Sequence, residues 1–436
     1  MFDLLYRRFL LASINSRSIE WTWEWKLSYL AGAVGLALWI CLMHGLMIID
    51  VWDETNIFIV LDTPPFATNT FSKSVSYIWT HFLGLYRPLA TTILLVGGKW
   101  GLGFIELRYV NALFLVMGIG LFAIALKRHF AVPSLWVVIF ALLTLTSAST
   151  VITIGWFANI FDASCLFFIA LGFILILEKK NVWGCIAVGL AFFCKEIAIL
   201  SIPFLFILKN QNKLSWKSLW IIVASILMIA MCYGFIRQSV VPLGSETDIH
   251  KFSKDVFLSS TSIFMESFWL QNTKLDPDSF QRYIGYLFFV FSFLCAPGYK
   301  NKLIFTSIFL TSAVAYWGMF AYQSDNVVSS LNFVGRLYLI PSTLILFLLI
   351  ADRRRIGVLV LAFPIIVGAV GTYRDHVRFQ ELYQSIFAMA VGNATPLVID
   401  YPEKPLSDLK RQVEIGNYPG AMLAVDTKNA RLFSRN

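Results

Sequence analysis

Acidic and basic residues gather beside apolar segments of this chain, where an isolated charge is costly. They are, in chain order, Asp53, Glu54, Arg87, Asp162, Lys195, Glu196 and Arg336. A charged side chain at the centre of a bilayer costs about 2.5 to 3.5 kcal/mol on insertion scales, so each one needs a partner or a function. A carboxylate can take a proton from a hydroxyl, and cations can hold a phosphate as negative charge gathers on it. The set therefore predicts transfer of a group, such as a sugar, from a lipid phosphate to a hydroxyl.

Each of these residues also has a purely structural interpretation. The acidic pair at 53 and 54 could be the solvated end of a membrane span, and Lys195 with Glu196 could form a buried structural pair. Arg87 and Arg336 could anchor helix ends at the membrane interface. Arginine binds two phosphate oxygens through its planar fork, whereas lysine acts as a point charge. Both kinds of cation could therefore contribute to a phosphate site.

The composition is that of an integral membrane protein. Of the 436 residues, 58% are hydrophobic and 14% are charged, whereas a soluble domain has about 25% charged residues. The net charge of +9 does not indicate a nucleic-acid partner, because cytoplasmic loops of membrane proteins collect Lys and Arg. The six cysteines show no metal-ligand spacing, so we predict neither disulfides nor a zinc site. The predicted fold class is an all-α polytopic membrane protein.

Nine apolar segments are candidates for membrane-crossing helices, which need about 20 residues each. They are 27–49, 107–126, 131–148, 160–177, 217–236, 283–297, 302–322, 337–350 and 356–373. Two other segments are ambiguous. The segment 87–103 opens on Arg-Pro and is interrupted by glycines, so we predict a helix lying in the outer interface. The segment 182–208 carries a Lys-Glu pair at its centre, and it is either one span or a hairpin of two half-length helices.

The distribution of basic residues favours the hairpin. With the N-terminus in the cytoplasm, the hairpin leaves every basic loop between spans in the cytoplasm, whereas a single span exports the run 353–355 of three arginines. The prediction is then eleven membrane segments, with the loops 50–106 and 237–282 on the external side. An external tail, 374–436, is a small extension of the transmembrane domain 1–373.

The order of the motifs resembles that of the GT-C class of polytopic glycosyltransferases. VWDETNIFIVLDTPPF is similar to the acidic motif of their first loop, GLYRPLATTILL to their Arg-Pro-Leu element, and AFFCKEIAIL to their Lys-Glu hairpin. RYVNALFLVMGIGLFAIALKRH resembles their second span, and GRLYLIPS resembles a late motif of O-mannosyltransferases that carry tetratricopeptide repeats. The resemblance covers roughly residues 27–350, but the chain has no repeat array and has Asp-Glu where many relatives have Asp-Asp.

The resemblance implies roles for nine residues. Catalysis falls to Asp53 and Glu54, contacts to the donor phosphate to Arg87, Lys195 and Arg336, and other substrate contacts to Tyr86, Asp162, Glu196 and Tyr338. The donor it implies is a sugar on a polyprenyl phosphate, with inversion at the sugar carbon and with no metal. A metal on Asp53, Glu54 and Asp162 would be expected only with a pyrophosphate donor.

The implied location is the periplasmic face of a bacterial inner membrane. The acceptor is either a surface glycan such as O-antigen or an exported protein such as pilin, and a nucleic-acid partner is not expected. The alternative is a flippase or other transporter of a lipid-linked sugar, which would also bury cations at mid-depth. A transporter should show paired broken helices in its two halves, and the sequence has a single broken element, 182–208.

Overall fold

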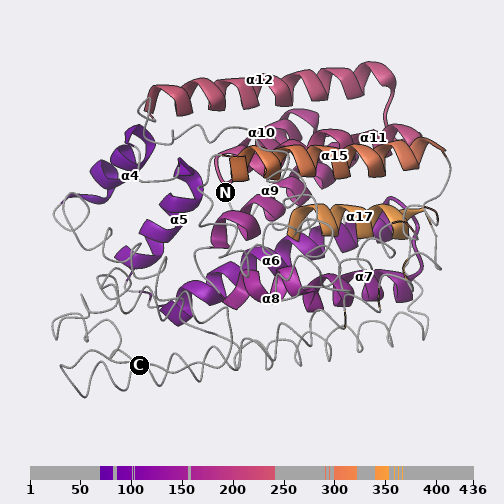
Figure 1. Cartoon of the computed structure of the whole chain (residues 1–436), viewed down its shortest axis with the longest axis horizontal. Helices are drawn as coiled ribbons and strands as arrows, with labels where there is room; N and C mark the ends of the chain where they lie inside the picture. Colours follow the sequence, from indigo (N-terminus) through magenta and orange to yellow (C-terminus); the bar gives the residue numbers. More distant parts are fainter. Residues whose placement is uncertain are drawn as a thin grey trace, which may run out of the picture.

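The computed structural model describes residues 69–81, 86–100, 102, 104–155, 159–240, 299–321 and 339–352, with the single residues 290, 294, 358, 362 and 366. Every regular element within these ranges is a helix, and none is a strand (Figure 1). Three of the helices are long and apolar enough to cross a membrane, namely α6 (Phe104–Arg128), α9 (Ile160–Leu177) and α12 (Trp216–Val240). The described part is therefore an all-helical protein with helices that fit a membrane.

Several predicted segments lie outside the described residues. They are the span 27–49, all but isolated residues of 283–297 and 356–373, most of the loop 237–282 and the tail 374–436. The predicted interfacial helix is present as α5 (Pro88–Lys99), preceded by α4 (Phe71–Thr80). Both lie at one end of the bundle, whose long helices run along the longest axis of the molecule (Figure 1).

Helix α9 lies inside the bundle and α12 lies on its outside (Figure 1). In the apolar window of α9, 67% of the residues are buried, against 28% in α12. Helix α6 approaches α9 closely at Gly118, where a Cβ atom would stand 3.1 Å from the Cα of Phe167. Farther along both helices, the rings of Phe122 and Phe173 are 5.9 Å apart. The two helices therefore run in the same direction.

The segment 182–208 folds as a hairpin and not as one continuous span. Its first arm, α10 (Asn181–Phe192), runs antiparallel to α9. Gly184 packs against Gly172 of α9, and Lys195, just after the arm, reaches Asp162 in the first turn of α9. Gly184 also lies close to Ile176, near the end of α9, so the contacts of the first arm cover most of the length of α9.

The second arm returns beside the first. It consists of a short 3-10 helix, η2 (Glu196–Leu200), and α11 (Ser201–Asn210). The ring centroids of Phe204 and Phe173 are 4.8 Å apart, and Phe173 lies in the C-terminal part of α9. The Lys209 ammonium at the end of α11 lies 5.6 Å from the ring centroid of Trp216, where α12 begins. The hairpin therefore begins and ends at the same end of the bundle, and its turn lies at the other end.

Basic residues of the described helix ends and loops collect at that end. They are Lys127, Arg128, Lys179, Lys180, Lys209, Lys213 and Lys302. The side chain of Gln211 donates a 2.9 Å hydrogen bond to Asp352, which follows α17 (Leu339–Ala351). Asn210 donates a 2.8 Å hydrogen bond to Asn301, near the start of α15 (Tyr299–Ala321), and Asn301 donates in turn to Asp352. These polar contacts fasten three helix ends together beside the basic residues.

The prediction of a single span at 131–148 was wrong at its C-terminal end. Helix α7 (Ser134–Thr146) has 13 residues, which gives a length of about 20 Å. It stops at Ser147, whose backbone is extended, and a second helix, α8 (Ala148–Gly155), follows. The hydroxyl of Ser147 accepts a 3.3 Å hydrogen bond from the N–H of Thr150. Ser and Thr side chains compete with helix hydrogen bonds in this way, and an apolar count over the segment does not register it.

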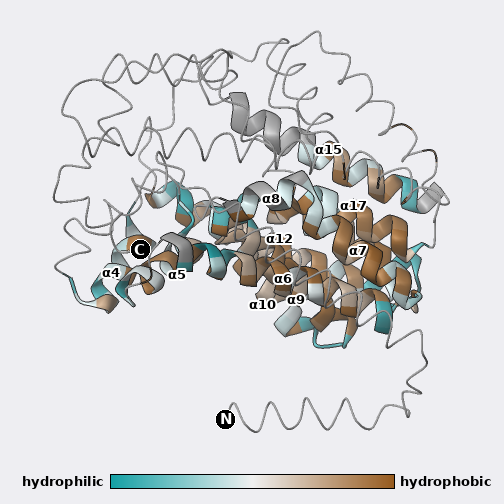
Figure 2. Ribbon diagram, turned by 90° about the horizontal axis from the view of Figure 1, so that it is seen from below, coloured by the Kyte–Doolittle hydropathy of each residue, from teal (hydrophilic) through white to brown (hydrophobic). Residues whose placement is uncertain are grey.

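Phenylalanine rings fill the interior between the helices. The ring centroid of Phe347 in α17 lies 5.3 Å from that of Phe122, 6.1 Å from that of Phe140 and 5.3 Å from that of Phe204. The pairs with Phe140 and Phe204 have edge-to-face geometry. Such pairs stabilise a core by about 0.5 to 1.5 kcal/mol beyond the area that they bury. Hydrophobic residues dominate the middle of the bundle, and hydrophilic stretches lie toward α4 and α5 (Figure 2). The apolar interior thus holds in place the ends at which polar groups gather.

The contact between α9 and α10 depends on a pair of glycines, and its loss should weaken the hairpin. In Gly172→Ala, the new Cβ would lie 2.8 Å from the carbonyl oxygen of Gly184, so the helices must separate. We expect destabilisation by about 1 to 3 kcal/mol, the usual cost of overpacking, measured by unfolding of the purified protein in detergent. The matched control is Gly120→Ala in α6, where a Cβ meets nothing within 4 Å. Equal stability of the two variants would contradict the close packing described here.

Candidate functional site

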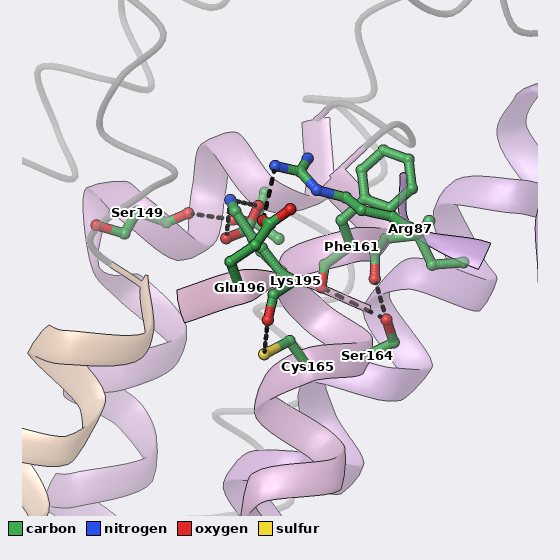
Figure 3. Close-up of polar contacts among 10 residues, drawn as sticks. Arg87, Ser149, Phe161, Ser164, Cys165, Lys195 and Glu196 are labelled. Atoms are coloured by element: carbon green, nitrogen blue, oxygen red, sulfur yellow. Dashed lines mark hydrogen bonds and ion pairs between the residues drawn. The ribbon is translucent and has the colours of Figure 1, made fainter. Parts of the chain in front are cut away.

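A cluster of charged and aromatic side chains lies at the end of the bundle opposite the basic loops. The residue before α5, the first turn of α9, the turn of the hairpin and the last third of α12 all contribute to it. Figure 3 shows Arg87, Phe161, Lys195 and Glu196 converging from these elements. The cluster contains two ion pairs, which differ in geometry.

Arg87 precedes α5 and is fixed by the backbone around it. Pro88 occupies the first turn of the helix, where proline needs no hydrogen-bond partner. The next backbone N–H, of Leu89, donates a 3.2 Å hydrogen bond to the carbonyl oxygen of Phe193 in the hairpin turn. The start of α5 is thereby fastened to the hairpin, and Arg87 is directed at the same turn.

The Arg87 guanidinium makes few contacts for a group so nearly buried. Its side chain is 11% exposed, and its plane lies over the ring of Phe161, with Cζ 5.1 Å from the centroid. One nitrogen, Nη2, lies 3.3 Å from Oε2 of Glu196. Among the residues that the structure describes, its Nε–H has no hydrogen-bond partner. Arg87 therefore keeps donor capacity that the protein itself does not use.

The charge of Arg87 is secured by its surroundings. Burial alone would lower the pKa of the guanidinium, but the carboxylates of Glu196 and Asp162 raise it, and the net pKa lies above its ordinary value. The side chain is therefore a permanent cation that faces the cluster.

Glu196 is the most open charged group of the cluster. Its side chain is 39% exposed, and its two oxygens have different partners. Oε2 faces Arg87, and Oε1 lies 3.2 Å from the hydroxyl of Tyr233, which donates to it. The same hydroxyl lies 2.8 Å from the carbonyl oxygen of Tyr86. Tyr233 thus connects α12, the hairpin turn and the residue before Arg87.

The second ion pair, between Lys195 and Asp162, is closed. The ammonium nitrogen of Lys195 lies 2.6 Å from both carboxylate oxygens of Asp162. The two side chains are 5% and 3% exposed. The hairpin turn is also tied to α9 by the carbonyl oxygen of Lys195, which accepts a hydrogen bond of 3.8 Å from the thiol of Cys165. This pair joins the turn to α9 and leaves neither charge open to solvent.

Tyr86 serves as packing in this structure. Its ring is 2% exposed, and its hydroxyl donates a 3.1 Å hydrogen bond to the carbonyl oxygen of Trp79 in α4. The indole N–H of Trp79 donates to Thr92 of α5 at 3.2 Å. These contacts hold α4 and α5 together beside the cluster.

Of the nine site residues predicted from the sequence, five are described, and the structure brings all five together. They are Tyr86, Arg87, Asp162, Lys195 and Glu196. The remaining four, Asp53, Glu54, Arg336 and Tyr338, lie outside the described residues. Lys195 and Glu196 are neighbours in the chain, but their ion pairs are with other residues, so the interpretation of the two as one structural pair is wrong.

Sequence reasoning missed Tyr233 and Phe161. Both lie in apolar segments, where an aromatic residue is usually part of the core or of the interfacial belt. The available signal for Tyr233 was its position one turn before Arg237, near the end of an otherwise apolar helix. A hydroxyl and a cation at that spacing lie on one helix face, and that face meets the hairpin turn.

The arrangement can bind an anion and hold a carboxylate beside it, on a helical frame that includes three helices long and apolar enough to cross a membrane. No protein-family model, curated protein or solved structure matches this chain. Among the described residues, no three His, Cys, Asp or Glu side chains are grouped to hold a metal ion, a search that does not include Asp53 and Glu54.

The closed pair should behave as a structural element. Lys195→Met leaves Asp162 charged and buried without its partner, which costs about 3 to 5 kcal/mol in comparable cases. The double variant Lys195→Met/Asp162→Leu removes both charges and should recover most of that stability, measured by unfolding in detergent. A double variant no more stable than Lys195→Met would show that the pair does more than neutralise two buried charges.

Proposed function

We propose that this protein transfers a monosaccharide from a polyprenyl phosphate to an acceptor hydroxyl, with inversion at the sugar carbon. The observation that carries the proposal is the state of Arg87. It is a permanent cation with an unused donor among the described residues, and it lies beside a half-exposed carboxylate at one end of a membrane bundle. A phosphate that becomes the leaving group gathers negative charge, and a fixed guanidinium stabilises that charge.

The position of the cluster suits a donor anchored in the bilayer. Helix α4 carries polar residues on its exposed face, and α5 packs against it beside the cluster. Short helices of this kind lie in the plane of the interface. A lipid phosphate would be held there, with its isoprenoid chain among the apolar helices and its sugar toward water. The aqueous acceptor would approach from the same end.

The predicted topology completes the proposal. It has eleven membrane segments, a cytoplasmic N-terminus, and the cluster on the periplasmic side of a bacterial inner membrane. The gathering of the described basic loops at the far end of the bundle supports this orientation, because cytoplasmic loops are enriched in Lys and Arg. The acceptor is a surface glycan or an exported protein.

The roles within the site follow from the two ion pairs. Arg87 is the donor-phosphate contact, and Asp53, with Glu54, would take or orient the acceptor proton. Lys195 is held by both oxygens of Asp162, so in this structure it fixes the hairpin turn against α9. Its contact with the donor phosphate would require Asp162 to release it. Arg336 and Tyr338 would close the site from the start of α17.

Arg87 provides the most direct test. Arg87→Ala should lower sugar transfer at least about 100-fold, the usual effect of removing a donor to a developing anion, while Arg87→Lys should lower it about tenfold because a point charge replaces a fork. The assay is purified protein with a radiolabelled polyprenyl-phosphate sugar and envelope acceptors. Lys73→Ala in α4 removes an exposed positive charge and serves as the control. Equal activity of Arg87→Ala and the control would reject the proposed role.

Asp53 provides an independent test of the chemistry. Asp53→Asn keeps the shape of the side chain and removes the proton acceptor, so transfer should fall about 100-fold or more while donor binding persists. The rate of sugar transfer and the binding of the same labelled donor are measured for both wild type and Asp53→Asn. Unchanged transfer would remove Asp53 from the mechanism. Movement of the donor across vesicle membranes without transfer would favour the flippase.

A further inference from the structure

The hydrogen bond between Tyr233 and Glu196 has a direct effect on Arg87. A carboxylate beside a guanidinium normally accepts two parallel N–H bonds. Here Glu196 uses one oxygen only, Oε2, at 3.3 Å from Nη2. Its other oxygen, Oε1, lies 3.2 Å from the Tyr233 hydroxyl. That second oxygen is the one that a side-on pair would place on the Nε–H of Arg87.

The Nε–H of Arg87 is left without a hydrogen-bond partner among the described residues. Leaving a buried donor without a partner is unfavourable, and Glu196 could satisfy this donor by rotating toward it. Tyr233 opposes that rotation because its hydroxyl binds Oε1. We propose that Tyr233 is a positioning residue, which holds Glu196 out of a two-point pair with Arg87 and so keeps one edge of the guanidinium open for an anionic group.

The hydroxyl of Tyr233 is itself held in place. The tyrosine is 4% exposed, and its ring packs edge-on against Phe193, with centroids 5.3 Å apart. The single O–H proton has two acceptors, Oε1 of Glu196 and the carbonyl oxygen of Tyr86 at 2.8 Å. The carbonyl precedes Arg87 in the chain. Tyr233 therefore sets both the backbone from which Arg87 extends and the carboxylate that Arg87 faces.

The identity of the anionic group rests on the proposed function, in which it is the phosphate of a polyprenyl carrier. The open edge then gives that phosphate two donors, Nε–H and a second guanidinium nitrogen, in the forked geometry that arginine offers to phosphate oxygens. If Tyr233 released Glu196, the carboxylate would occupy this edge and would also repel the phosphate. Loss of the hydroxyl should thus weaken phosphate binding although Tyr233 does not touch the phosphate.

The test is a cycle of two substitutions measured by binding of farnesyl monophosphate to the purified full chain in detergent. Tyr233→Phe keeps the ring and removes the hydroxyl, and it should raise the Kd about tenfold. In the Glu196→Gln background the same change should raise the Kd less than about twofold, because a neutral amide does not compete for Arg87. Farnesol, which has no phosphate, should bind all four proteins alike. Tyr109→Phe in α6 is the control for loss of a phenol elsewhere.

Two outcomes would overturn the inference. If Tyr233→Phe has the same effect in both backgrounds, the hydroxyl acts only through the Tyr86 carbonyl. If it has no effect in either background, the hydroxyl does not position the site.

A wild type whose binding of farnesyl monophosphate does not exceed that of farnesol would reject the proposed function instead. In that case, thermal unfolding of the same four proteins without ligand tests whether Tyr233 restrains Glu196. Non-additive changes in Tm, the signature of directly interacting residues, would support it. Additive changes would reject it.

Discussion

The burial of one ion pair organises the end of the bundle at which the charged side chains gather. Lys195 and Asp162 lie 2.6 Å apart at both carboxylate oxygens and are almost closed to solvent. Neither charge would tolerate this environment alone, because the cost of removing an ion from water is recovered only through a partner. The pair therefore obliges the turn of the hairpin to lie against the first turn of α9. The backbone of the hairpin, once held there, accepts the N–H of Leu89 and so receives the start of α5.

The same constraint makes the second ion pair different. Since Lys195 is committed to Asp162, the neighbouring Glu196 takes Arg87 instead, across a longer contact and with its side chain partly in solvent. The closed pair fixes the hairpin turn against α9, and the other pair leaves the Glu196 side chain partly in contact with solvent. Because Lys195 and Glu196 are adjacent, one turn carries both a buried and a partly exposed charge.

The half-length arms of the hairpin follow from similar reasoning about backbone polarity. A helix that ends within an apolar layer exposes carbonyl and N–H groups, which must be satisfied by protein or by a wet cavity. Here the break at Lys195 is enclosed by α9, by the residues before α5 and by α12 through Tyr233. Small residues allow the close approach that this enclosure needs, as at Gly172 and Gly184. The broken element is thus also the place where polar side chains gather.

The sequence by itself determined the all-helical, apolar character of the described part and where many of its helices lie. The range predicted for α9 is the range observed, and the Lys-Glu break at 195 and 196 marks the hairpin turn. These features are readable because hydrophobicity and charge are properties of each residue, and an apolar layer selects segments by their length and composition alone. The end of α7 was missed because the hydroxyl of Ser147 accepts a hydrogen bond from the backbone N–H of Thr150. This local contact does not change the apolar character of the segment.

Only the tertiary structure decided which charges pair. Arg87 and Glu196 are far apart in the chain, and Lys195 turns away from its neighbour to Asp162. Five predicted site residues were found together, but their individual environments, closed for one pair and open for the other, were not predictable from residue type. Tyr233 was missed because a tyrosine in an apolar helix is usually part of the core or of the interfacial belt, and only the folded structure shows which groups its hydroxyl contacts. Pairing depends on distances between helices, and packing sets those distances.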